Sequence, residues 1–240
     1  MGKLFLVATP IGNLADITFR AIEVLEGVDL VLAEDTRKTG RLLKEILPSE
    51  KTPPPLLPFF EGNELKKQPE ILAKLLNGND VALVTNAGTP VIADPGFKLV
   101  RACLGAGIEV VGVPGPNAAI TALSISGLPT DKFLFLGFLP KKKGKIKKMF
   151  QAFANLADSP IFPTLVFYES PYRLLKTLSL AQKIFPAHTQ VVIARELTKV
   201  HEEKIAGNLK EVLDKLENKK IKGEITVVLS LKKHPPQIKL

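Results

Sequence analysis

Apolar segments of strand length alternate with amphipathic segments of helical period through the first half of the chain. The apolar runs predict strands at residues 4–10, 29–36, 80–84 and 108–113. Apolar positions that recur every three or four residues predict helices at residues 16–28, 36–47, 64–78, 96–107 and 114–127. Strands that alternate with helices form βαβ units. This half therefore predicts a mostly parallel, buried sheet.

Turn-forming residues mark the ends of several of these elements. Thr36 or Thr39 can cap the second helix, and Asp94 can cap the fourth. Pro95 then falls in the first turn of that helix, where a missing N–H costs nothing. The proline-rich segment 52–64 cannot form a central strand, so its end is predicted to lie along a sheet edge.

A second set of elements begins after residue 127, where Pro129 and Asp131 indicate a domain boundary. Its apolar runs predict strands at residues 132–139, 163–170, 189–196, 202–209 and 223–231, with helices at 171–183 and 208–217. We therefore predict two α/β domains and an irregular tail, with bounds at residues 1–127, 128–232 and 233–240.

Composition narrows the class of protein. The chain carries 33 basic and 24 acidic residues, a net charge of +9, which favours polyanionic partners such as nucleic acid. Cys103 is the only cysteine and lies in an apolar helical pattern, so we expect a buried structural thiol. The three histidines show no ligand spacing, and we expect no metal site. No apolar run reaches the roughly 18 residues of a membrane span, and the expected location is the cytoplasm.

Polar and Gly/Pro clusters follow four of the predicted strands, at residues 8–13, 33–37, 85–90 and 114–119. In open parallel sheets, ligands bind beyond the carboxyl ends of the strands. These loops therefore predict one wall of a small-molecule site. The sequence has neither GxGxxG after a strand nor GxxxxGK[ST], so a dinucleotide site or a P-loop lacks support. Composition and spacing do not identify the ligand.

The clearest basic patch is the run KKKGKIKK at residues 141–148. It follows a predicted strand and contains Gly144, so we expect a mobile loop that contacts phosphates and gives affinity independent of base sequence. The side chains expected to bind RNA are Lys141, Lys142, Lys143, Lys145, Lys147, Lys148, Arg195 and Lys199.

Seven ordered motifs carry a resemblance to a known family. They are VATPIGNLADITFRA, AEDTR, NAGTPVIADPG, VPGPNAA, SGLPTDKFLFLGFLP, FYESPYRL and ARELTKVHEE. In this order they resemble the bacterial ribosomal RNA small subunit methyltransferase I family, within the tetrapyrrole methylase superfamily, over almost the whole chain. The resemblance implies a two-domain class III methyltransferase fold, with a mostly parallel N-terminal sheet and a mixed C-terminal sheet.

The same resemblance implies an activity and partners. We expect a homodimer that binds S-adenosylmethionine between its two domains. The expected reaction is 2′-O-methylation of a cytidine in the decoding region of 16S ribosomal RNA in the small ribosomal subunit. The cofactor contacts that the family motifs imply are Pro10, Gly12, Asn13, Asn86, Ala87, Gly88, Thr89, Pro116, Asn117, Ala118, Tyr168, Glu224 and Ile225.

Three positions depart from the family pattern. Asn86 stands where an aspartate is expected, which removes a negative charge near a cationic cofactor. Gly62 and Tyr172 each stand where a histidine is expected.

Methyl transfer to a ribose hydroxyl benefits from a nearby base. The candidates are Glu34, Asp35, Glu169 and Glu196, with Lys199 only if its pKa is lowered. Each has a simpler interpretation: the motif AEDTR can be a helix cap with an ion pair to Arg37, and Arg195 with Glu196 can be an ordinary ion pair. We favour Glu34, Asp35, Arg37 and Glu196 as the residues lining the RNA side.

Three other interpretations remain open at this point. The chain can be a methyltransferase for a small tetrapyrrole, since a carboxylate-rich substrate also suits a basic site. It can be a non-catalytic relative that binds the ribosome. An unrelated nucleotide-binding module is the third, although it lacks a phosphate motif.

Overall fold

The computed structural model describes residues 1–155 and 163–231. The chain divides into two compact units, Met1–Asn117 and a second that begins at Ala118. Helix α5 (Ala118–Ile125) belongs to the second unit because it packs on two of that unit's strands, β7 and β10. The boundary predicted near residue 128 therefore lies after this helix, whereas the units divide before it. The predicted tail lies outside the described residues.

A five-stranded sheet forms the centre of the first unit. Its strands are β1 (Leu4–Val7), β2 (Leu30–Ala33), β3 (Leu56–Pro58), β4 (Val81–Val84) and β5 (Val110–Val113). They lie in the order β3-β2-β4-β1-β5, and every pairing is parallel. The predicted parallel sheet is thus confirmed. The proline-rich segment supplies edge strand β3, as expected, because proline has no backbone N–H to donate to a second neighbouring strand.

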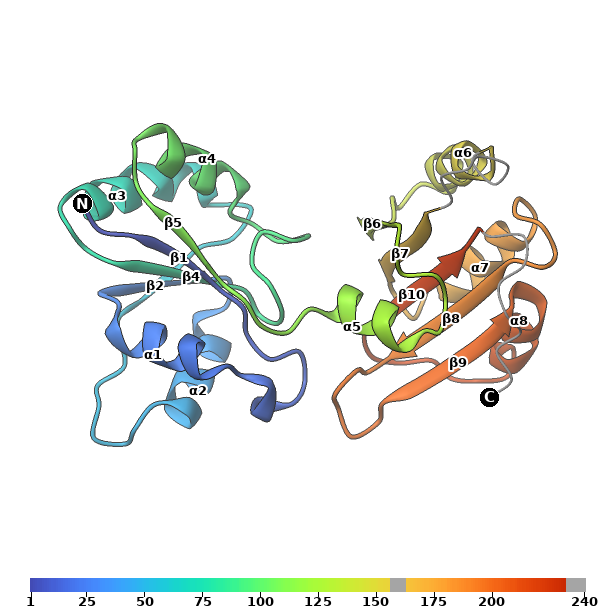
Figure 1. Ribbon diagram of the computed structural model, residues 1–240, viewed down its shortest axis with the longest axis horizontal. Helices are drawn as coiled ribbons and strands as arrows, with labels where there is room; N and C mark the ends of the chain where they lie inside the picture. The colour runs from blue at the N-terminus through green and yellow to red at the C-terminus, as the bar shows by residue number, and fades with distance from the viewer. Residues whose placement is uncertain (156–162, 232–240) are drawn as a thin grey trace. The chain divides into compact units, whose positions relative to one another are not determined.

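Two helices cover each face of this sheet (Figure 1). They are α1 (Phe19–Gly27), α2 (Thr36–Ile46), α3 (Glu64–Leu76) and α4 (Phe97–Gly105). Side chains of β4 alternate between the faces: Val81 and Leu83 pack with α3 and α4, and Ala82 and Val84 pack with α1 and α2. Burial on both faces explains why β4 reads as a continuous apolar run.

The second unit contains a mixed sheet, also as expected. Its strands are β6 (Phe133–Phe138), β7 (Thr164–Glu169), β8 (Gln190–Arg195), β9 (Glu203–Asn208) and β10 (Ile225–Ser230). Their order is β6-β7-β10-β8-β9, in which only the β6–β7 pairing is parallel. Helices α6 (Lys143–Ala154), α7 (Leu174–Gln182) and α8 (Leu209–Leu216) share one apolar core with this sheet.

The prediction of a mobile loop at residues 141–148 is wrong. Helix α6 begins at Lys143 and includes Gly144 in its first turn. Ile146 and Phe150 are four residues apart, and both are buried in the core of the second unit. That apolar spacing fixes the segment as a helix, and the lysines occupy its exposed side.

Cys103 lies in α4 and is fully buried. Burial raises the pKa of its thiol to about 11, so it is the structural thiol that the sequence predicted.

No helix among the described residues is long and apolar enough to cross a membrane. No group of three or more potential metal ligands occurs in the part of the chain that the structure describes.

Candidate active site

The loops after β1, β4 and β5 are joined by hydrogen bonds at the carboxyl edge of the first sheet. The backbone N–H of Thr9 donates to Gly88 O, and that of Gly88 donates to Thr9 O, each at 2.9 Å. Thr89 Oγ1 donates to Pro116 O at 3.2 Å, and Asn117 Nδ2 donates to Thr89 Oγ1 at the same distance. These hydrogen bonds join three of the four predicted loops.

Glycines allow these loops to approach one another. Gly88 has a φ of 83°, a conformation that residues with a Cβ rarely adopt. A Cβ on Gly115 would lie 3.0 Å from the Cβ of Ala8, at the end of β1. A side chain at Gly115 would push its loop away from the end of β1, whereas a side chain at Gly88 would strain the backbone.

Glu34 connects the loop after β2 to the loop after β4. Its Oε2 accepts from Thr85 Oγ1 at 3.2 Å and from the backbone N–H of Asn86 at 3.4 Å. The hydroxyl of Thr9 lies 3.3 Å from Thr85 O, which links β1 to the same position. Thr85 is buried, whereas the side chain of Asn86 is exposed. A single carboxylate thus fixes the backbone on which Asn86 is presented.

Asp94 is a second carboxylate at this point, and the sequence prediction assigned it a different role. It does not cap α4, whose N-cap is Gly96 without a side-chain hydrogen bond. Asp94 instead interacts with the side chain of Thr85. Burial raises the pKa of Asp94; the Thr85 bond opposes the shift, and the nearby charge of Glu34 adds to it. Two carboxylates therefore flank one buried hydroxyl.

The loop that carries Asp94 is strained. Val91 and Ala93 have φ values of 72° and 65°, and a β-branched residue in this region is unusual. Backbone strain of this kind persists where the surrounding structure enforces it and is frequent at functional sites. No sequence signal indicated it, because neither residue is a glycine or an asparagine.

Replacing Asp94 with asparagine is expected to raise the melting temperature at pH 7. The amide preserves the shape of the side chain without ionising in a half-buried position. Because the folded-state pKa of Asp94 lies above its ordinary value of 3.8, the fold favours the protonated form. The wild type therefore loses stability relative to Asp94→Asn as the pH rises through the raised pKa. Thermal melts over a pH series measure this difference, which should vanish below pH 3.8. A variant that melts below the wild type at pH 7 would contradict it.

Asp35 and Arg37 bind each other at the start of α2. Asp35, rather than Thr36 or Thr39, is the N-cap, and its carboxylate accepts from Arg37 N at 3.0 Å and from Arg37 Nη2 at 2.9 Å. The hydrogen bonds from Arg37 lower the pKa of Asp35 to about 2. A carboxylate this acidic is a weak base, and the geometry agrees with the simpler interpretation of a helix cap with an ion pair.

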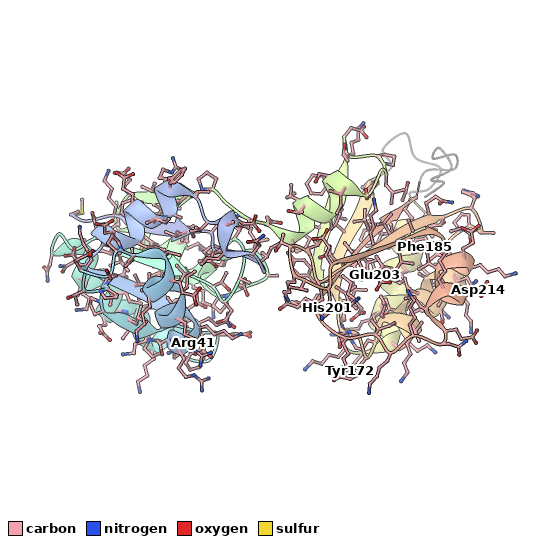
Figure 2. The ribbon with its side chains drawn as sticks, turned by 90° about the horizontal axis from the view of Figure 1, so that it is seen from below. Arg41, Tyr172, Phe185, His201, Glu203 and Asp214 are labelled. Carbon is pink, nitrogen blue, oxygen red and sulfur yellow. The ribbon has the colours of Figure 1, made fainter. Side chains whose placement is uncertain are left out.

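Glu196, in the second unit, is held by two donors. Glu224 N donates to Glu196 Oε1 at 2.8 Å, and Lys199 Nζ donates to the same atom at 2.9 Å. The bond from Glu224 is the main cause of a lowered pKa for Glu196. Arg195 does not pair with Glu196. It binds Glu203 at 3.0 Å, a residue labelled in Figure 2.

Lys199 also binds Glu224 Oε2, at 2.8 Å. Burial opposes protonation of Lys199, but its bonds to Glu224 and Glu196 outweigh burial and raise its pKa. Lys199 could act as a base only with a lowered pKa. Because its pKa is raised, Lys199 is no longer a candidate for the base. The charge of Lys199 is neutralised within the chain, as is that of Arg195.

Glu169 is fully buried, and its partners indicate a structural role. Arg173 lies 2.6 Å from its Oε1, and Thr177 Oγ1 donates to its Oε2 at 2.6 Å. The neighbouring Tyr168 is half-buried, with its ring 5.1 Å from that of Phe135. Ile225 points into the apolar core, so only its backbone could contact a ligand.

The remaining predicted residues lie at the surface or in turns. Asn13 caps a short 3-10 helix, η1 (Leu14–Asp16), by accepting from Ala15 N at 3.0 Å. Gly62 is exposed in the turn before α3. Tyr172 is 90% exposed and lies at the periphery of the second unit in Figure 2. Neither departure from the histidine pattern disturbs the core.

Comparison with known proteins gives the family. The sequence pattern of the tetrapyrrole (corrin/porphyrin) methylases matches residues 3–213. A protein of Thermotoga maritima named ribosomal RNA small subunit methyltransferase I is 47% identical, over 96% of this chain and 99% of that protein. A protein of Escherichia coli O157:H7 with the same name is 47% identical, over 95% of this chain and 77% of that protein.

Solved structures show the same fold. The crystal structure of the methyltransferase CobJ matches with a TM-score of 0.69 at 18% identity, covering 95% of this chain and 94% of that chain. Uroporphyrin-III-C-methyltransferase from Thermus thermophilus matches with a TM-score of 0.62 at 22% identity, again over 95% and 94%. The chain therefore belongs to the tetrapyrrole (corrin/porphyrin) methylase family, among the proteins named ribosomal RNA small subunit methyltransferase I.

Proposed function

We propose that this chain, a methyltransferase that uses S-adenosylmethionine, methylates the 2′-oxygen of a cytidine in the decoding region of small-subunit ribosomal RNA. The similarity to ribosomal RNA methyltransferases over nearly the whole chain supports an RNA substrate. The net charge of +9 agrees with a polyanionic substrate. The observation that carries the proposal is the pair of carboxylates, Glu34 and Asp94, placed among loops at the carboxyl edge of a parallel sheet.

The residues at this edge fit the proposed cofactor. S-adenosylmethionine supplies an electrophilic methyl group on a sulfonium cation. Glu34 and Asp94 provide negative charge beside the exposed Asn86, which compensates in part for the missing aspartate at that position. Gly88 allows the turn of this loop, because its φ of 83° is a conformation that residues with a Cβ rarely adopt. We propose that Asn86–Thr89 and Pro116–Asn117 form the cofactor wall in this unit.

Glu34 is our proposed proton acceptor. A ribose hydroxyl is a poor nucleophile while it is protonated, and a positioned base contributes about 10²–10⁴-fold to such reactions. Asp35 and Glu196 have lowered pKa values, and Glu169 is buried against Arg173. Glu34 has no cationic partner among the described residues, and its oxygen bonds only neutral donors. It can therefore take the proton while the Thr85 hydroxyl holds it in place.

The test uses small ribosomal subunits from cells that lack this modification. After sedimentation shows whether the 26.1 kDa chain forms the expected homodimer, the protein is incubated with the subunits and methyl-labelled S-adenosylmethionine. We expect label on the 2′-oxygen of a decoding-region cytidine, mapped by nuclease digestion and mass spectrometry. Cofactor binding without label on RNA would contradict the proposed RNA substrate. Tetrapyrroles would then be assayed as substrates. Absence of both would contradict catalysis and indicate a binding protein.

A further inference from the structure

A cavity of about 350 Å³ lies between α6 and α7 of the second unit. Five of its lining side chains are cationic, namely Lys141, Lys143, Arg173, Lys176 and Lys183. No described aspartate or glutamate lines it. Its floor is apolar, formed by side chains such as Ile146 and Leu180, which belong to the core of the unit. Positive side chains around a cavity with an apolar, low-dielectric floor create a concentrated electrostatic field, and this field attracts anions.

The wall of this cavity is held rigidly. Arg173 is bound by the buried Glu169 and also donates to Leu139 O and Pro140 O, at 3.2 and 3.3 Å. These bonds fix the chain just before Lys141 against the start of α7. The residues from which the lysines project are therefore preorganised, and less entropy is lost when an anion binds.

The four lysines are available for an external partner. Among residues 1–155 and 163–231, none of them forms an ion pair. Lys176 lies in α7 and Lys183, seven residues later, is its C-cap with helical dihedrals, which places them on one face about 10 Å apart along the axis. No side chain caps the N-terminus of α6, where Lys143 lies. Free backbone N–H groups at such a terminus add to the attraction for an anion.

A second hollow adjoins the first along the same two helices. It shares Lys143, Leu180 and Lys183 with the first and adds Lys147, one turn further along α6. The cationic surface is therefore extended in one direction rather than confined to a single point. This extent favours a chain of phosphates over a single free phosphate, because successive lysines can neutralise successive charges.

We propose that the surface between α6 and α7, defined by Lys141, Lys143, Lys147, Lys176 and Lys183, binds the phosphodiester backbone of an RNA strand. This inference rests on the proposed function for the identity of the substrate. It adds α7 to the RNA contacts that the sequence predicted. It also selects, from the basic run, the lysines that face α7.

The test compares two charge-matched double variants. Lys176→Gln with Lys183→Gln removes two charges from α7, and Lys66→Gln with Lys74→Gln removes two exposed charges from α3 of the first unit. The probe is a fluorescently labelled single-stranded RNA of mixed sequence, titrated by fluorescence anisotropy at several salt concentrations. Each lost phosphate contact lowers the salt slope by about 0.7 for single strands. The α7 variant should therefore show a slope lower by about 1.4 and, near 0.1 M salt, binding about tenfold weaker.

Several outcomes decide the proposal. Lys176→Arg with Lys183→Arg preserves the charges and should bind like the wild type, and thermal melts of all variants check folding. An α7 variant that binds RNA like the α3 variant would overturn the proposal. Equal competition by millimolar inorganic phosphate at low salt would also overturn it, since the site would then hold a free anion. If the wild type labels ribosomal RNA but the α7 variant binds RNA normally, only this inference is refuted. If the α7 variant loses RNA binding but the wild type labels no RNA, only the proposed reaction is refuted.

Discussion

Arg173→Met lowers the free energy of unfolding by about 3–5 kcal/mol if Glu169 remains charged, because an uncompensated charge is then left in the interior. The side chain of Glu169 has no solvent exposure, whereas that of Arg173 is 29% exposed. Burial deprives the carboxylate of water as an alternative partner. For a chain of this size the expected decrease in melting temperature is on the order of 10 °C. Thermal and urea unfolding of the full chain measure it.

A second variant identifies the cause. Adding Glu169→Gln to Arg173→Met removes the buried charge, while the amide oxygen can accept from Ser170 N in place of Oε1 and the amide NH2 can donate to Thr177 Oγ1 in place of Oε2. Most of the lost stability should return. As a surface control, Lys67→Met breaks the exposed pair with Glu70 and should cost no more than about 1 kcal/mol. If the double variant is no more stable than Arg173→Met, the loss comes from packing and the electrostatic explanation is wrong.

Glu34→Gln is expected to reduce kcat by about 10²–10⁴-fold, because an amide cannot accept the ribose proton. The glutamine oxygen can still accept from Thr85 Oγ1 and Asn86 N, as the carboxylate does at 3.2 and 3.4 Å. The loop should therefore keep its conformation. Cofactor affinity, measured by calorimetry, should fall only a few-fold, because Asp94 still supplies negative charge there, so most of the loss should appear in kcat.

The matched control for this variant is Glu23→Gln, which changes an exposed carboxylate on α1 of the same unit. It should leave both kcat and cofactor affinity unchanged. A Glu34→Gln enzyme as active as this control would show that Glu34 is not the base. Loss of cofactor binding together with activity would show that Glu34 acts mainly through the cofactor and not as the base.

The basic run at residues 141–148 shows why part of the candidate site could not be predicted from the sequence. Its charge is visible in the composition, but Gly144 and the many lysines suggested a loop. Ile146 and Phe150 make the segment helical, since both are buried in the core of the second unit. Which lysines face α7 depends on the rotation of α6 about its axis, and that rotation is set by packing.

Asp94 shows a second limit. In the sequence, an aspartate followed by Pro95 is typical of a helix start. In the structure the helix begins at Phe97, and Asp94 lies beside the side chain of Thr85 instead. Positive φ values at Val91 and Ala93 direct the chain there, and no local rule predicts them because their cost is offset by contacts distant in the sequence.

The sequence by itself determined the alternation of strands and helices, the parallel first sheet, the four loops at its carboxyl edge and the family. These features follow from local periodicity, turn chemistry and the order of motifs, which are properties of neighbouring residues. Only the tertiary structure decided which carboxylates have cationic partners, that Glu34 and Asp94 flank Thr85, and that α7 adds Lys176 and Lys183 to the basic surface. Such pairings join residues far apart in the chain, so they depend on how the elements pack and not on any one segment.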